Sequence, residues 1–229
     1  MVVKKKFFGG ITIVVIISFI VLICCFFFTR HDREEEALNY KIVKPKNALP
    51  IITKEHGVTK VNGHVIVNKH YTLPPSHKPG EDKHAKKQLN KLLAKAEKDN
   101  IDLKFRSGYR SYQDQQDIMK KFVKEEGKNQ AKHYTAVPGH SEHQTGLAFD
   151  VGTDAPMQDF KKDFGKSKEG KWLAQHAPKY GFIIRYPKGQ EKETGYSYEA
   201  WHIRYVGRDL AEIINGEHTN LETYYNLPN

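Results

Sequence analysis

Cysteine is nearly absent from this chain of 229 residues, which contains only two cysteines. Both of them, Cys24 and Cys25, lie in an apolar run near the N-terminus, so no cysteine follows residue 25. The remainder of the chain therefore has no disulfide, no thiolate metal ligand and no cysteine nucleophile. Any metal ion bound there must be held by His, Asp or Glu side chains.

Charged residues are absent from the apolar or small-residue run between Phe7 and Phe28, and three lysines at positions 4–6 precede it. At about 1.5 Å per residue, a helix of this length crosses a hydrocarbon core of about 30 Å. The preceding lysines favour an N-terminus inside the cell and the following chain outside. We therefore predict that residues 1–28 form a membrane anchor, in a single-pass protein of the cell membrane.

A cleaved signal peptide and a lipoprotein signal are the two alternatives to an uncleaved anchor. A cleaved signal peptide has a shorter apolar core and an Ala-x-Ala-like exit, which this sequence lacks. A lipoprotein signal needs a small residue before the modified cysteine; Ile23 before Cys24 fits poorly, and Cys24 before Cys25 fits only slightly better. A lipoprotein stays the alternative prediction.

Acidic residues are outnumbered by basic ones, 27 against 37, which gives a formal net charge of +10. Such an excess favours a polyanionic neighbour or serves solubility alone. Because the predicted topology places the charges outside the cell, anionic cell-wall polymers or the outer membrane face fit better than nucleic acid. No nucleic-acid partner is expected.

Residues 29–60 are charged, contain proline and lack a sustained helical or strand period, which predicts an extracellular stalk. A folded domain is predicted over 61–229. Its apolar periodicity predicts helices over 84–98, 111–126, 172–180 and 209–214, and strands over 101–105, 147–151, 182–186 and 201–206. Helices and strands mix without a repeated βαβ rhythm or internal repeats, so the predicted class is α+β.

Arg110 lies where a predicted strand gives way to a predicted helix. The helix start is indicated by Ser111 with Asp114 three residues later, a pattern typical of a capping box. A side chain at such a junction can point into a cleft.

His143 and Asp150 are seven positions apart, and on one continuous helix they would be separated by about 10 Å, too far to share a metal ion. Gly146 allows a turn between them, and the alternation of Leu147, Phe149 and Val151 predicts a strand on which Asp150 faces away from the core. The two residues are then either ligands of one metal ion or an unrelated surface histidine and carboxylate.

A third candidate ligand lies downstream. In the strand predicted around His202, Trp201, Ile203 and Tyr205 share one face, and His202 lies on the other with Arg204. Two histidines and one carboxylate match the three protein ligands of catalytic zinc, which keeps a further position for water. Glu199 would approach such a metal only from a bend before the strand.

Three motifs occur in order: Ser-Gly-Tyr-Arg-Ser-Tyr-Gln-Asp-Gln at 107–115, Ser-x-His-x-x-Gly-x-Ala-x-Asp at 141–150, and Glu-x-Trp-His at 199–202. Together with a Val-Asn-Lys-x-Tyr-x-Leu-Pro-like stretch at 67–74, this set resembles the VanY-type D-alanyl-D-alanine carboxypeptidases. VanX, the L,D-carboxypeptidases, lysostaphin-like enzymes and hedgehog domains are their relatives. The resemblance covers residues 61 to 229.

The resemblance implies a small central antiparallel sheet that carries a zinc site and is flanked by helices. Carried over by position, it implies that His143, Asp150 and His202 bind Zn²⁺. It further implies that Glu199 is the general base, that Arg110 binds substrate and stabilises the transition state, and that Ser141 and Gln115 lie near the substrate. His140, just before the second motif, is not expected to be a ligand.

The implied activity is removal of the terminal D-alanine from peptidoglycan stem peptides outside the cell. An L,D-carboxypeptidase acting on tetrapeptide stems uses the same machinery and is the alternative within enzymes. A non-catalytic cell-wall-binding domain of the same fold is the alternative outside them.

Overall fold

The computed structural model describes residues 49–127, 135–154 and 162–228. The predicted anchor at 1–28 and most of the predicted stalk lie outside these ranges. Within the described ranges, no helix combines the length and apolar character that a membrane crossing requires.

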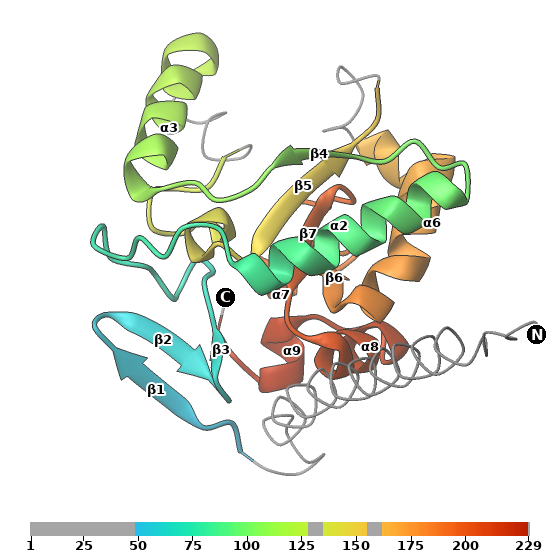
Figure 1. The fold of residues 1–229 in the computed structure, drawn as a ribbon. Coiled ribbons are helices and arrows are strands. Elements are labelled where there is room, and N and C mark those ends of the chain that lie inside the picture. The colour runs from blue at the N-terminus through green and yellow to red at the C-terminus, as the bar shows by residue number, and fades with distance from the viewer. Residues whose placement is uncertain (1–48, 128–134, 155–161, 229) are drawn as a thin grey trace, which may run out of the picture. The chain divides into compact units, whose positions relative to one another are not determined.

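Two antiparallel sheets form the β part of the fold (Figure 1). The first has three strands in chain order, namely β1 (Ile52–Glu55), β2 (Val58–Val61) and β3 (His64–Val65). The second has the order β4-β5-β7-β6, from β4 (Lys104–Ser107), β5 (Ala148–Gly152), β7 (His202–Tyr205) and β6 (Phe182–Ile184). The predicted α+β class with an antiparallel sheet is confirmed.

The four longer helices are α2 (Lys83–Lys98), α3 (Tyr112–Glu126), α6 (Lys168–His176) and α8 (Arg208–Gly216). Shorter elements are η1 (Glu142–Thr145), η2 (Lys162–Lys166), η3 (Ala177–Tyr180), α7 (Glu191–Thr194) and α9 (Leu221–Tyr225). Each predicted helix is confirmed, with α6 and η3 together covering the one predicted at 172–180. That helical segment starts earlier than predicted because the Ser167 side chain caps α6 by accepting a hydrogen bond from the Gly170 amide.

Apolar side chains cover one face of the four-stranded sheet, where α2 runs across the strands (Figure 1). The core there joins Leu89 and Leu92 of α2 to Phe149 of β5 and Ile203 of β7, all fully buried. Burying a leucine side chain contributes roughly 1.5–3 kcal/mol, so this packing holds the sheet rigid beneath the site. Side chains alternate along a strand, and the neighbours of Phe149 and Ile203 therefore project from the opposite face.

That opposite face is covered partly by α8. Leu210 and Ile214 of α8 pack with Ile183 of β6. The preceding residue of β6, Phe182, packs in the core on the α2 side of the sheet. The strand β6 thus contributes to both cores. The part of this face carried by β5 and β7 holds polar side chains instead.

Regular structure begins at Ile52, nine residues before the predicted boundary at residue 61. The strand β1 and most of β2 therefore lie within the range predicted as the stalk. Two tight turns explain the difference, because His56-Gly57 and Asn62-Gly63 all adopt positive φ and join β1 to β2 and β2 to β3. An Asn-Gly pair between β-forming residues is a strong hairpin signal that does not depend on a long apolar period.

The strand predicted at 101–105 is displaced. Ile101 and Leu103 are buried in the core, but they precede β4, which starts at Lys104. Phe105 is 40% exposed, and the Lys86 ammonium lies 3.5 Å from its ring centroid. The Lys86 ammonium covers one face of the Phe105 ring, whereas the alternating pattern had predicted that Phe105 packs in the core.

Candidate metal centre and active site

Sheet register brings two of the three predicted ligands together. Asp150 on β5 and His202 on β7 are direct cross-strand partners, so their side chains leave the same face of the sheet next to each other. The His202 Nδ1 atom lies 2.9 Å from Asp150 Oδ1. This pairing depends on antiparallel register between segments fifty-two residues apart in sequence.

His143 reaches the same point from η1. Its Nε2 atom lies 3.1 Å from Asp150 Oδ2, and one donor atom from each of the three residues lies within 4.8 Å of the others. Gly146 ends η1 with φ of +75°, and a Cβ there would stand 2.0 Å from the carbonyl oxygen of Gly80. The turn that the sequence requires at this position therefore depends on glycine. All three side chains are buried.

The contacts of His143 determine which nitrogen is free. Its Nδ1 lies 2.7 Å from the carbonyl oxygen of Gly108, which can only accept, so Nδ1 donates there and Nε2 is the nitrogen that faces Asp150. Burial by itself raises the pKa of Asp150, but the two histidines outweigh it and hold that pKa well below its usual range. Two imidazole nitrogens and a permanently ionised carboxylate are a donor set suited to a divalent metal ion.

Glu199 lies in the bend before β7, where the sequence required it to be. Its backbone carbonyl accepts from the His202 amide at 3.3 Å, and its own amide donates to the carbonyl of Tyr186 at 3.0 Å. Burial, together with the negative charges of Asp150 and Glu142, outweighs the nearby cations and raises the pKa of Glu199 to about 7. A carboxyl group with such a pKa is suited to accept and return a proton near neutral pH.

Arg110 lies at the start of α3, and its amide donates to the carbonyl of His143 at 3.2 Å. Burial lowers the pKa of its guanidinium, against the opposing effect of Asp150 and two further carboxylates, one of them Glu199. Arg110 therefore lies close enough to the three-residue group for its charge to act there.

Gln115 stands behind Arg110. It is 1% exposed, and its Oε1 accepts from Arg110 Nη1 at 2.8 Å while its Nε2 donates to Thr135 Oγ1 and to the carbonyl of Ala136. Both ends of the amide are thus engaged within the protein, which places Gln115 as a support for Arg110.

Ser141 is 5% exposed and immediately precedes η1. Its role near the substrate stays a prediction, as do the roles of the other predicted site residues.

Sequence reasoning missed a set of buried charges beside His202. Glu142 Oε1 accepts from Arg185 Nε at 3.0 Å and from Arg204 Nη1 at 2.9 Å, and Arg185 also pairs with Glu222. All four residues are at most 2% exposed. The sequence pattern placed Arg204 on the same strand face as His202. This was the one signal in the sequence for a charge cluster beside His202.

Two tyrosines stack beside His202, whereas His140 lies outside the metal-binding group. The ring of Tyr186 stacks on His202 with a centroid distance of 5.5 Å and an interplanar angle of 7°, and Tyr196 stacks on Tyr186 in turn. His140, which was not expected to be a ligand, directs its Nδ1 to the carbonyl oxygen of Asn68 at 2.8 Å. It does not belong to the metal-binding group.

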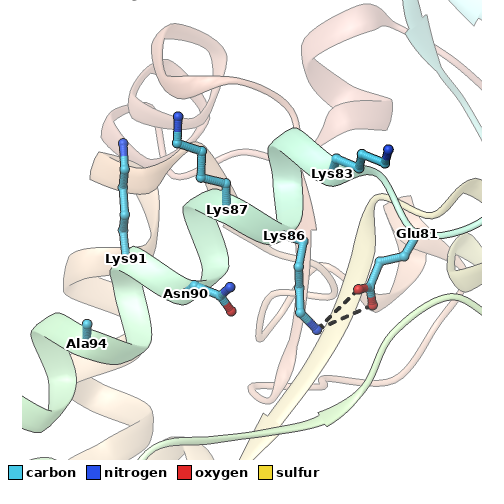
Figure 2. Close-up of a pocket in the computed structure, with 7 residues that line it drawn as sticks. All are labelled: Glu81, Lys83, Lys86, Lys87, Asn90, Lys91 and Ala94. Carbon is cyan, nitrogen blue, oxygen red and sulfur yellow. Dashed lines mark hydrogen bonds and ion pairs between the residues drawn. The ribbon is translucent and has the colours of Figure 1, made fainter.

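A concave surface lies along α2, and none of the predicted site residues lines it. This depression has a volume of about 610 Å³, and four lysines, Glu81, Asn90 and Ala94 line it (Figure 2). Lys83, Lys87 and Lys91 extend from the helix, while Lys86 turns to Glu81 at 3.2 Å. The lysine-rich face of α2 is thus a basic surface distinct from the buried site.

Comparison with known proteins gives a consistent result. Residues 79–208, more than half of the chain, match the family model described as VanY, D-alanyl-D-alanine carboxypeptidase. The putative carboxypeptidase YodJ of Bacillus subtilis is 40% identical over 179 residues, which are 70% of this chain and 66% of that protein. The chain thus spans slightly less than two thirds of this relative.

Solved structures agree in fold. An L,D-carboxypeptidase, DacB from Streptococcus pneumoniae, matches with a TM-score of 0.72 and 38% identity, covering 78% of this chain and 97% of the other. The D,D-pentapeptidase VanY of a VanB-type resistance cassette, solved as a mutant with Zn(II), matches with a TM-score of 0.60 and 33% identity, covering 69% and 96%. The chain therefore belongs to the VanY family of carboxypeptidases, which are hydrolases of peptide bonds.

Proposed function

We propose that this protein is a zinc-dependent D-alanyl-D-alanine carboxypeptidase that removes the terminal D-alanine from peptidoglycan stem peptides outside the cell. The observation that carries this proposal is the convergence of His143, Asp150 and His202, with the Glu199 carboxyl and the Arg110 guanidinium close by. Family membership and the Zn(II) complex of a VanY enzyme support the choice of metal and reaction.

The residues fit zinc by their chemistry. His143 would bind through Nε2, since Nδ1 is committed to Gly108, and His202 through the Nδ1 atom that faces Asp150. Three protein ligands without cysteine are typical of catalytic rather than structural zinc. When bound, zinc lowers the pKa of a coordinated water toward about 7 and polarises a carbonyl group.

The side chains of this protein perform the proton transfers and position the substrate. Glu199 accepts the proton of the attacking water and returns it to the amine of the departing D-alanine. The Arg110 cation stabilises negative charge that develops on the carbonyl oxygen, a type of interaction often worth about 3–4 kcal/mol. Gln115 holds the guanidinium in place through the 2.8 Å hydrogen bond, and Ser141 lies near the substrate.

The test of the proposed function is the Glu199→Ala variant. It should bind zinc as the wild type does and lose hydrolysis of a pentapeptide stem by at least about a hundredfold, because a general base contributes about 10²–10⁴-fold. Released D-alanine and zinc content are measured on the same samples. Zinc-loaded wild-type protein that hydrolyses no stem peptide would contradict the proposal and favour a non-catalytic cell-wall-binding domain.

L,D-carboxypeptidase activity is the second candidate. It is favoured by the higher TM-score of DacB, 0.72 against 0.60 for the VanY enzyme. Both reactions use the same proton transfers and differ in the residue before the scissile bond. Purified protein offered pentapeptide and tetrapeptide stems separates them, since D-alanine released only from the tetrapeptide contradicts D,D specificity.

The proposed location is the outer face of the cell membrane, with residues 1–28 as a single-pass anchor or, alternatively, as a lipoprotein signal. The uncharged run from Phe7 to Phe28 after three lysines supports it. Anionic cell-wall polymers are the proposed neighbours of the basic α2 surface. Protease added to intact cells should remove the folded domain, and a domain that survives until lysis would contradict this location.

A further inference from the structure

Glu142 lies directly beside the candidate metal ligands without belonging to them. Its Oε2 atom is 3.5 Å from His202 Nε2, at the long end of hydrogen-bond distance. Within the part of the chain that the structure describes, neither of these two buried atoms has a better partner. Buried polar atoms are rarely left unpaired, so their mutual approach is significant.

The Glu142 carboxylate is held from its other side. Oε1 accepts from Arg185 Nε at 3.0 Å and from Arg204 Nη1 at 2.9 Å, so the carboxylate lies between two guanidinium cations. The carboxylate is therefore ionised and can only accept hydrogen bonds.

Both arginines are themselves anchored. Arg185 donates from Nη1 and Nη2 to Glu222 at 2.9 and 2.6 Å, and Arg204 donates from Nη2 to the carbonyl of Val65 at 2.7 Å. The residue that follows β6, together with β7 and the three-stranded sheet, thus contributes to the position of Glu142. Movement of Oε2 away from His202 would break contacts in several elements at once.

The two nitrogens of His202 face different partners. Nδ1 faces Asp150 and the shared metal position, while Nε2 faces Glu142. A histidine that binds a metal through one nitrogen commonly donates the N–H of the other to a carboxylate, which fixes the tautomer and the ring orientation. Tyr186, stacked on the ring face, restricts rotation but offers no such acceptor in the ring plane.

We propose that Glu142 is a positioning residue that accepts the Nε2 proton of His202 and thereby keeps the Nδ1 lone pair directed at the metal. This inference rests on the proposed zinc function. It assigns a role to the second residue of the Ser-Glu-His motif, and it makes Arg185 and Arg204 supports of the metal centre.

A purely structural role for Glu142, as counter-ion of the two arginines, makes a different prediction. Glu222 is the matched control, because its carboxylate also pairs with Arg185 and accepts its further hydrogen bond from Asn68. If Glu142 serves stability alone, Glu142→Gln and Glu222→Gln should behave alike.

The experiment compares zinc dissociation constants of the wild type, Glu142→Gln and Glu222→Gln, measured by competition with a chromophoric chelator. In Glu142→Gln an amide oxygen can still accept from an arginine, but an NH₂ group would then face His202 Nε2. We expect zinc binding about 10–100-fold weaker in Glu142→Gln and within about threefold of wild type in Glu222→Gln. Unfolding of each metal-free protein in urea separates stability from affinity.

Nitrogen-15 spectra of the histidine rings in the zinc-loaded wild type give a second measurement that requires no variant to fold. They should show His202 protonated at Nε2. An unprotonated Nε2, or equal zinc affinity in Glu142→Gln and Glu222→Gln, would overturn the inference. Wild-type protein that binds no zinc would instead overturn the proposed function, so the two failures are distinguishable.

Discussion

Ion pairs occur in two contrasting settings in this molecule. On α2, Lys86 pairs with Glu81 and Lys95 with Asp99 through side chains that are 28–44% exposed. In the network around Glu142, the carboxylates and guanidinium groups are at most 2% exposed. Both settings pair a carboxylate with a cation, which is an ammonium group on α2 and a guanidinium group in the buried network.

Burial decides what these pairs can do. Exposed pairs contribute about 0–1 kcal/mol, because water and salt screen the attraction and the side chains lose freedom. A buried pair gains little on balance against its desolvation, but removal of one partner leaves an uncompensated charge and costs about 3–5 kcal/mol. The buried network is therefore suited to fix positions, and the exposed lysines to offer charge to a partner.

The largest effect is expected when the buried network loses a cation. Arg185→Met leaves Glu142 and Glu222 without their shared partner and should lower the free energy of unfolding by about 3–5 kcal/mol. Urea denaturation of the metal-free protein measures this. Arg208→Met, which removes an exposed partner of Glu212, is the matched control and should cost less than about 1 kcal/mol. Equal losses in both variants would contradict the comparison.

The next effect concerns pH. Burial, and then the charge of Arg204, lower the pKa of His64 from 6.5 to about 4. Because the unfolded chain binds this proton more readily, the stability contributed by neutral His64 is complete above about pH 6.5 and is lost as the pH falls toward 4. The loss should amount to roughly 1–3 kcal/mol.

His64→Gln removes this titration. The difference between the unfolding free energies of wild type and variant should therefore change between pH 6.5 and pH 4, while common contributions such as that of Glu199 cancel. Parallel profiles over this window would show that neither burial nor the charge of Arg204 lowers the pKa of His64.

A smaller effect is expected at α3, the helix that follows Arg110 in the chain. Ser111 Oγ accepts from the Asp114 amide at 3.1 Å, and Asp114 accepts in return from the Ser111 amide at 3.0 Å. Ser111→Ala should lower the free energy of unfolding by about 1 kcal/mol, between the buried and exposed extremes. Ser111→Thr, which retains a capping oxygen, is the control, and thermal unfolding is the measurement. A loss equal to that of Arg185→Met would break the ranking.

The smallest effect is expected on α2. Lys95→Ala removes an exposed pair with Asp99, whose other oxygen still accepts from the Trp172 indole, and should cost about 0.2–0.5 kcal/mol. High salt should abolish the difference from wild type. A loss of several kcal/mol that persists in high salt would show that exposure does not separate the two settings.

Much of the fold could be predicted from local patterns. The capping box at Ser111, the apolar periodicity of α2 and the end of the helix predicted at 172–180 each depend on residues within one or two turns, and the structure confirms all three. The strands β1 and β2 were missed because their signal lies in the short turns and not in a long apolar period. Phe105 was misplaced because a lysine from another element covers it.

The candidate site likewise combines features that the sequence predicted with features that only contacts between distant residues decided. The positions of His143, Asp150 and His202 could be named from motifs and from alternation along strands, and the structure brings them together. Gln115 could be named but not placed, since only packing shows its amide enclosed behind Arg110. Glu142 and Arg185 could not be singled out, because a charged residue in a sequence is most often exposed.

By itself, the sequence determined the residue types available for chemistry. Without cysteine after residue 25, a metal site in the folded domain had to use histidine and carboxylate, and three ordered motifs indicated which ones. Only the tertiary structure decided the register that sets Asp150 beside His202 and the burial that makes a network of Glu142 and two arginines. The physical reason is that electrostatic interactions depend on distance and on exclusion of water, and the folded chain determines both through contacts between residues remote in sequence.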